Sequence, residues 1–134
     1  MLASWGDDLA MMRAAISEPG RYYHGERSIV LRNGMPLEKE RRYLWHELVH
    51  AERGDAAFHT DAAVETIVEQ EAVRRALPMQ SLRWALGQEL ERHMVAEMLK
   101  LPEDWIQYRL DTATARERRE LRLLQEGLWA EEIA

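Results

Sequence analysis

The chain has 134 residues, of which 46% are hydrophobic and 31% are charged, and its 24 acidic and 18 basic side chains give a net charge of −6. This length and balance fit one globular domain and exclude an intrinsically disordered chain. The negative charge disfavours binding to nucleic acid or an anionic membrane, and the absence of cysteine excludes disulfides, thiol catalysis and cysteine-ligated metals.

The first part of the chain predicts one helix and a short β-ribbon. Apolar residues recur with roughly helical spacing over residues 7–17, so we expect a helix there that ends at Pro19-Gly20. Residues 28–32 are partly β-branched and precede the turn pair Asn33-Gly34, which predicts a strand. Tyr22-Tyr23 could supply its partner strand.

The rest of the chain is predicted to be helical. A long helix over residues 37–53 begins after Pro36 and ends at Gly54, the residue type that most often closes a helix. The sequence therefore predicts a single, mainly α domain with a small β-ribbon, which belongs to the α+β class. The further helices are expected at about residues 61–76, 79–86, 89–99, 102–110 and 114–129.

The long predicted helix contains His46-Glu47-Leu48-Val49-His50, which has the pattern His-Glu-x-x-His. Histidines four residues apart project from one helix face and can bind one cation. Glu47 lies beside the first histidine and could take a proton from a metal-bound water, as in zinc-assisted amide hydrolysis. The motif predicts one Zn²⁺ per chain, with His46 and His50 as ligands and Glu47 as general base. An accidental pair of surface histidines is the alternative.

A catalytic zinc needs a third protein ligand, which cannot be cysteine here. Glu65 and Glu69 lie one turn apart on the next predicted helix, so a helical hairpin could bring one to the metal and leave the other to orient a histidine. Spacing alone leaves a second interpretation open, in which Glu65, Glu69 and Glu71 form a solvated acidic face.

Two blocks of the sequence resemble the ImmA/IrrE metallopeptidases, especially short actinobacterial and actinophage members. Residues 41–55, RRYLWHELVHAERGD, resemble the active-site helix of that family, and residues 65–78, ETIVEQEAVRRALP, are similar to its second block. The resemblance implies a zincin-like fold in which Glu65 is the third zinc ligand and Glu69 contacts a ligand histidine. The family usually has the shorter Asp or Asn at the position of Glu69. Weaker similarity extends over about residues 22–125.

The same resemblance implies an endopeptidase that cleaves a helix-turn-helix transcriptional repressor and so derepresses phage, mobile-element or stress genes. Residues 1–134 would form one metallopeptidase domain, with a catalytic core over about 1–100 and a helical segment over about 101–134. The alternatives are a regulatory module of this fold that binds a repressor or DNA without cutting it, and a structural zinc domain. We expect a cytoplasmic protein, bacterial or phage-encoded and acting in the host cytoplasm. The chain has no cysteine, its start lacks the basic region of a signal peptide, and no apolar run approaches the ~20 residues of a membrane helix.

Zinc peptidases also need a hydrogen-bond donor for the oxyanion that forms during hydrolysis. Tyr22, Tyr23 and His24 are the candidates, although an exposed turn would explain all three equally well. Elsewhere, Trp45, Trp84 and Trp105 lie on apolar helix faces and are predicted to be core. The basic excess over residues 109–122 could touch a nucleic-acid backbone, but alternating charge on a solvated helix explains it as well.

Overall fold

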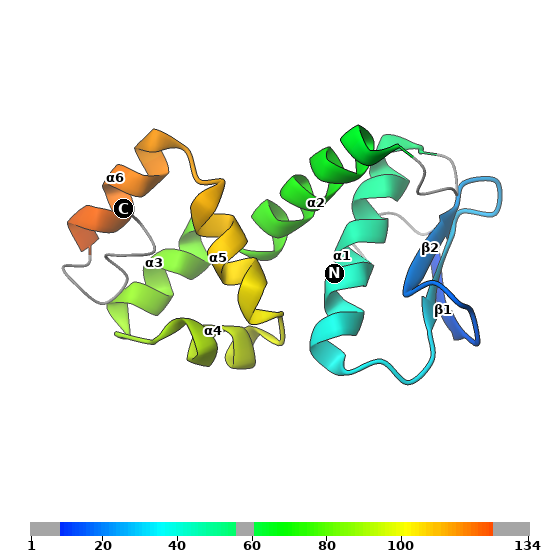
Figure 1. Cartoon of the computed structure of the whole chain (residues 1–134), viewed down its shortest axis with the longest axis horizontal. Helices are drawn as coiled ribbons and strands as arrows, with labels where there is room; N and C mark the ends of the chain where they lie inside the picture. Colours follow the sequence, from blue (N-terminus) through cyan, green and yellow to red (C-terminus); the bar gives the residue numbers. More distant parts are fainter. Residues whose placement is uncertain (1–8, 56–60, 125–134) are drawn as a thin grey trace. The chain divides into compact units, whose positions relative to one another are not determined.

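The computed structural model describes residues 9–55 and 61–124, and it confirms a mainly helical α+β chain (Figure 1). The chain divides into two compact units, Met1–Ala72 and Val73–Ala134, with the boundary inside the second helix. The expectation of one metallopeptidase domain, with a catalytic core over about 1–100 and a helical segment over about 101–134, stays a prediction. The elements are β1 (Ala10–Ala14), β2 (Gly20–Tyr23), β3 (Ser28–Arg32), α1 (Leu37–Arg53), α2 (Ala62–Ala76), α3 (Met79–Gly87), α4 (Arg92–Leu99), α5 (Glu103–Asp111) and α6 (Ala115–Leu124).

The three strands form one mixed sheet in the order β1-β3-β2. The predicted ribbon is present, because β2 and β3 pair antiparallel with Gly20 opposite Leu31 and Tyr23 opposite Ser28. β1 adds a third strand, which runs parallel to β3. Since an isolated two-stranded ribbon is marginally stable, this third strand helps to hold the sheet together.

The predicted helix over residues 7–17 is wrong, because its described part contains β1. Ala10 lies opposite Ser28 and Ala14 opposite Arg32, so all of β1 pairs with β3. Alanine, methionine and arginine favour helices, but the preference is only a few tenths of a kcal/mol per residue. Pairing with β3 gives the backbone of β1 hydrogen-bond partners along one side and brings Met11 against the hydrophobic cluster of the first unit. This tertiary pairing overrides the local propensity.

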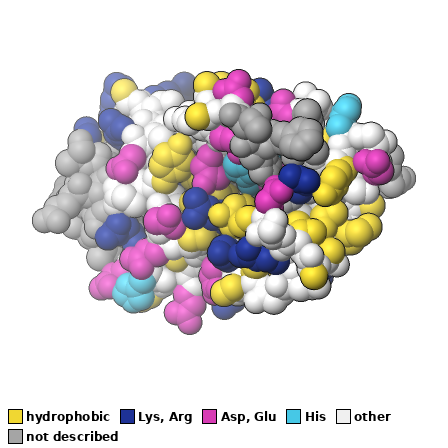
Figure 2. Space-filling view, turned by 45° about the vertical axis from the view of Figure 1, so that its right-hand side comes forward, with side chains coloured by type: hydrophobic (Ala, Val, Ile, Leu, Met, Phe, Trp, Pro, Cys, Tyr) yellow, Lys and Arg dark blue, Asp and Glu magenta, His cyan; other side chains and the backbone are white. Residues whose placement is uncertain are grey.

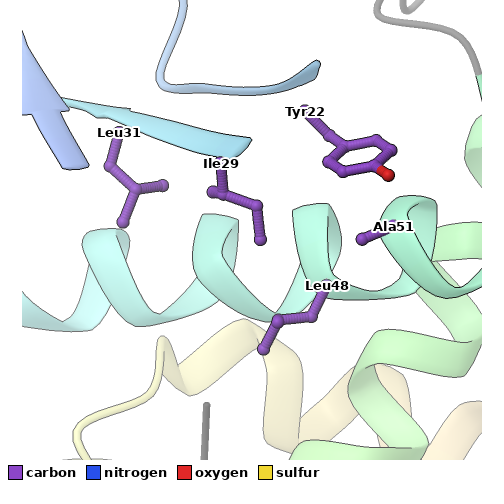
Figure 3. Packing of buried hydrophobic residues seen from close by; sticks show 5 residues of the cluster. All are labelled: Tyr22, Ile29, Leu31, Leu48 and Ala51. Atoms are coloured by element: carbon purple, nitrogen blue, oxygen red, sulfur yellow. The ribbon is translucent and has the colours of Figure 1, made fainter. Parts of the chain in front are cut away.

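The core of the first unit lies between the sheet and α1 (Figure 3). Ile29 and Leu31 lie two residues apart on β3 and therefore point to the same side, toward α1. Ala51 faces the Tyr22 ring. With Leu48, these side chains are at most 3% exposed, and full burial of a side chain of leucine size contributes about 1.5–3 kcal/mol to folding.

Helix α1 has the predicted bounds, and its C-terminal end is closed by Gly54. Gly54 has φ 74°, a left-handed conformation that only glycine adopts freely. Its N–H donates to the Ala51 carbonyl at 3.2 Å, and the N–H of Asp55 donates to the His50 carbonyl at 3.1 Å. This pair of bonds is a Schellman motif, which turns the chain back and places Asp55 beside the last turn of α1.

The second unit is helical throughout its described part, where α4 packs against α5 and α3 against α6. Trp105 is buried, as predicted, but Trp84 is 47% exposed, so its assignment to the core is wrong. Helix α4 begins at Arg92 instead of 89, because Glu89 has φ 57° and ends the preceding segment. Among the described residues, no helix has the length and apolar character needed to cross a membrane.

Candidate metal centre

Three side chains from α1 and α2 converge on one point. Nε2 of His46 lies 2.6 Å from Oε2 of Glu65, and Nε2 of His50 lies 2.9 Å from Oε1 of the same carboxylate. The two imidazole centroids are 4.9 Å apart, as expected for residues one helical turn apart. One ligand atom from each of the three residues lies within 4.8 Å of the others, so this group could hold a metal ion.

The start of α2 determines where Glu65 lies. Asp61 caps the helix, because its Oδ1 accepts the N–H groups of Ala63 at 3.0 Å and Val64 at 3.3 Å. The N–H of Glu65 then donates to the Asp61 carbonyl at 2.9 Å. A side-chain cap of this kind fixes the first turn of a helix. Glu65 thus comes from a defined first turn and not from the preceding loop.

Glu69 contacts the imidazole nitrogen of His46 that does not face Glu65. Nδ1 of His46 lies 3.1 Å from Oε1 of Glu69, and Oε2 of Glu69 accepts a hydrogen bond from Nη2 of Arg42 at 2.8 Å. Because an ionised carboxylate can only accept, Nδ1 carries the hydrogen and Nε2 is directed toward Glu65. The structure thus places Glu69 where the sequence predicted an orienting residue. Its greater length than Asp or Asn does not prevent this contact.

His50 has an equivalent partner in Asp55, which the sequence analysis did not identify. Nδ1 of His50 lies 2.9 Å from Oδ2 of Asp55, and the same oxygen accepts from Nε of Arg53 at 2.8 Å. The signal that could have identified Asp55 is its place directly after Gly54, because a left-handed glycine cap folds the next residue back onto the helix.

The carboxylates around the centre raise the pKa of His46. Burial lowers the pKa of His46, but the hydrogen bond to Glu69 and the charges of Glu47, Glu69 and Glu65 outweigh it, so the pKa is raised. Burial raises the pKa of Glu69, yet its bonds from His46 and Arg42 bring it below the ordinary value. The pKa of Asp55 is lowered in the same way, because His50 and Arg53 outweigh its burial. This negative environment favours a cation.

Glu47 is completely buried, on the α1 turn that carries His46 and His50. It lies about 100° around the helix axis from His46, so it borders the ligand face without being one of the three converging residues. This position beside the ligands is the one that the sequence predicted for a general base. Its role in proton transfer stays a prediction.

Of the predicted oxyanion donors, Tyr22 and Tyr23 lie at the end of β2, and His24 begins the turn that leads to β3. The Tyr22 hydroxyl is buried, accepts from Nη1 of Arg27 at 2.7 Å, and lies 2.9 Å from Nδ1 of His24. Arg27 also donates to the Ala51 carbonyl at 3.2 Å, so this cluster holds the turn against the end of α1. His24 is exposed and Tyr23 is half-buried. Their action on an oxyanion stays a prediction.

No family model, no curated protein and no solved structure matches this chain.

Proposed function

We propose that the protein is a zinc-dependent endopeptidase with a zincin-like fold, related to the ImmA/IrrE metallopeptidases. The observation that carries this proposal is the convergence of the Nε2 atoms of His46 and His50 on the two oxygens of Glu65. Two imidazoles and one carboxylate form a three-ligand set typical of catalytic zinc, which leaves a coordination position for water or substrate. A structural zinc site normally has four protein ligands, so this set favours catalysis.

The residues around the centre have separable tasks. When bound, zinc lowers the pKa of a coordinated water toward ~7 and polarises the scissile carbonyl. Glu69 and Asp55 accept the Nδ1 hydrogens of His46 and His50, which keeps both Nε2 atoms available as ligands. The Glu47 carboxylate, buried beside the ligands, takes a proton as general base and returns it to the leaving amine.

The proposed substrate is a helix-turn-helix transcriptional repressor, whose cleavage would release phage, mobile-element or stress genes. This part of the proposal rests on the resemblance of residues 41–55 and 65–78 to the two family blocks. A regulatory module that binds a repressor or DNA without cutting it would need neither a buried Glu47 nor an open three-ligand site. The enzyme is therefore the better-supported function.

The decisive experiment incubates the zinc-loaded protein with the repressor encoded beside its gene and searches for a discrete fragment by mass spectrometry. We expect cleavage by the parent and none by Glu47→Gln, which should still bind zinc. Glu52→Gln is the matched control, because Glu52 is an exposed glutamate of the same helix, and it should cleave like the parent. If the repressor forms stable complexes with both the parent and Glu47→Gln and no fragment appears, the regulatory module that binds without cutting would be favoured.

A further inference from the structure

Gly20 is a buried glycine whose backbone does not require glycine. It opens β2, and among the described residues only Gly34 and Gly54 are glycines with positive φ. The reason for a glycine at position 20 therefore has to be space. It lies opposite Leu31 on β3, on the face of the sheet that packs against α1.

A side chain at position 20 would meet three neighbours. A Cβ placed there would lie 3.2 Å from Cδ2 of Leu31, 3.3 Å from Cγ of Glu47 and 3.4 Å from Cβ of Tyr43. Carbon atoms in favourable contact are about 3.5–4.0 Å apart, so the contacts with Leu31 and Glu47 would be too close, while the contact with Tyr43 would be at the limit of ordinary contact. Tyr43 and Glu47 lie one turn apart on α1, so Gly20 brings β2 close to the turn of that helix that carries Glu47.

The three neighbours differ in how they can relieve the crowding. Cβ of Tyr43 is attached to the helix backbone and moves only with α1. Cδ2 of Leu31 and Cγ of Glu47 move by rotation of their side chains. Because Glu47 is completely buried, a rotation that withdraws its Cγ also moves its carboxylate relative to His46 and His50.

We propose that Gly20 is a positioning residue for Glu47: the missing side chain lets β2 hold the Glu47 stem against α1, in the orientation that directs its carboxylate to the metal centre. The expected effect on catalysis rests on the proposed function, whereas the expected displacement of the Glu47 carboxylate does not. It adds to the site a residue that neither binds metal nor moves protons.

The test compares Gly20→Ala with Gly25→Ala. Gly25 is the matched control, because a Cβ at that position meets nothing within 4 Å and its φ is not positive. Crystal structures of the zinc-loaded parent and both variants should show a displaced Glu47 carboxylate in Gly20→Ala alone, with His46, His50 and Glu65 superimposable. Zinc stoichiometry should be unchanged in all three.

Kinetics provide the second measurement. The probe is the peptide that the parent cleaves fastest in a library from a digested proteome. Gly20→Ala should lower kcat by about 10- to 100-fold, the range expected for a misplaced catalytic group, with KM within about twofold of the parent. Gly25→Ala should match the parent in both. A Glu47 carboxylate that superimposes on the parent position in Gly20→Ala would overturn the proposal, as would an unchanged kcat.

A double variant separates the Glu47 contact from the Leu31 contact. Leu31→Val removes the Cδ atoms, so Gly20→Ala/Leu31→Val leaves the contact with Glu47 as the main source of crowding, and it also serves if Gly20→Ala alone does not fold. The displacement of the carboxylate should persist in this double variant, and its disappearance would assign the effect to Leu31. If the parent cleaves no peptide and no repressor, the proposed function fails, while the crystal structures still decide the role of Gly20.

Discussion

Each histidine of the candidate metal centre contacts a carboxylate that is itself paired with an arginine. His46 meets Glu69, which is bonded to Arg42, and His50 meets Asp55, which is bonded to Arg53. The arginines help keep both carboxylates ionised, so the carboxylates remain acceptors for the Nδ1 hydrogens. If zinc binds here, we expect Glu65 to act as a ligand, while Glu69 and Asp55, which contact the histidines, tune the affinity.

Substitution of these acids should therefore produce graded losses of zinc affinity. Glu65→Ala removes a ligand and should abolish retention of zinc through gel filtration. Glu69→Ala and Asp55→Ala should weaken the affinity by about 10- to 100-fold, as is typical for partners of ligand histidines. Competition with a chromophoric chelator measures all three.

Glu71→Ala is the control for this series, because Glu71 is not one of the converging ligands. It should bind zinc like the parent. If Glu65→Ala retains zinc while Glu69→Ala or Glu71→Ala loses it, the assignment of the third ligand is wrong.

The residues of the centre differ in how far the sequence could reveal them. His46, Glu47 and His50 follow from the spacing on one helix. The need for a third ligand indicated Glu65 or Glu69 on the next helix, and the family resemblance selected Glu65. Asp55 and Gly20 were missed because their roles depend on a chain reversal and on a close approach of strand to helix. Such contacts arise only in the folded chain.

At the scale of elements, the start of α6 is joined to a buried arginine on α5. Thr114 and Glu117 form a capping box, because each side chain accepts the other's backbone N–H, at 3.0 and 3.1 Å. Glu117 also accepts two bonds from Arg109, which is 1% exposed, and one from Arg74. Arg109 donates further to the Leu77 carbonyl at 2.8 Å. The basic excess of residues 109–122 is thus partly structural, which local charge patterns could not show.

Glu117→Gln should destabilise the protein in a pH-dependent way. The bond from Arg109 brings the pKa of Glu117 from 4.5 to about 2, although partial burial opposes the shift. A lowered folded-state pKa means that the contribution is fully present above pH ~4.5 and is lost as the pH falls toward 2. Parent and variant should differ by about 1–3 kcal/mol in free energy of unfolding at pH 7, and should converge near pH 2.

Urea unfolding at several pH values measures this difference. Glu120→Gln is the matched control on the same helix, because Glu120 and its partner Arg83 are both 44% exposed in their side chains. It should change the free energy of unfolding by less than about 0.5 kcal/mol. A constant difference between the parent and Glu117→Gln from pH 7 to 2 would contradict the prediction.

At the scale of the whole molecule, the metal centre and the buried arginine belong to different compact units. All three candidate ligands lie within Met1–Ala72, whereas Arg74, Arg109 and Glu117 lie within Val73–Ala134.

The face in Figure 2 shows charged side chains of both signs between hydrophobic ones. Among the described residues, the large hydrophobic side chains that are exposed are Met12, Leu37, Ile67, Trp84, Met98 and Leu123.

Zinc removal should therefore affect the two units unequally. A metal present at 100 times its Kd stabilises the state that binds it by about 2.7 kcal/mol, which corresponds to about 100-fold slower amide exchange through openings that break the site. Chelation should accelerate exchange in the part of α1 around His46 and His50 and in the first turns of α2, while α5 and α6 exchange as before. Glu117→Gln should do the reverse, accelerating exchange in α5 and α6 without changing zinc affinity. Hydrogen exchange with peptide-level mass spectrometry measures both cases. Equal acceleration in all helices after chelation would contradict this prediction. It would show that the two compact units open together, with one common free energy of opening.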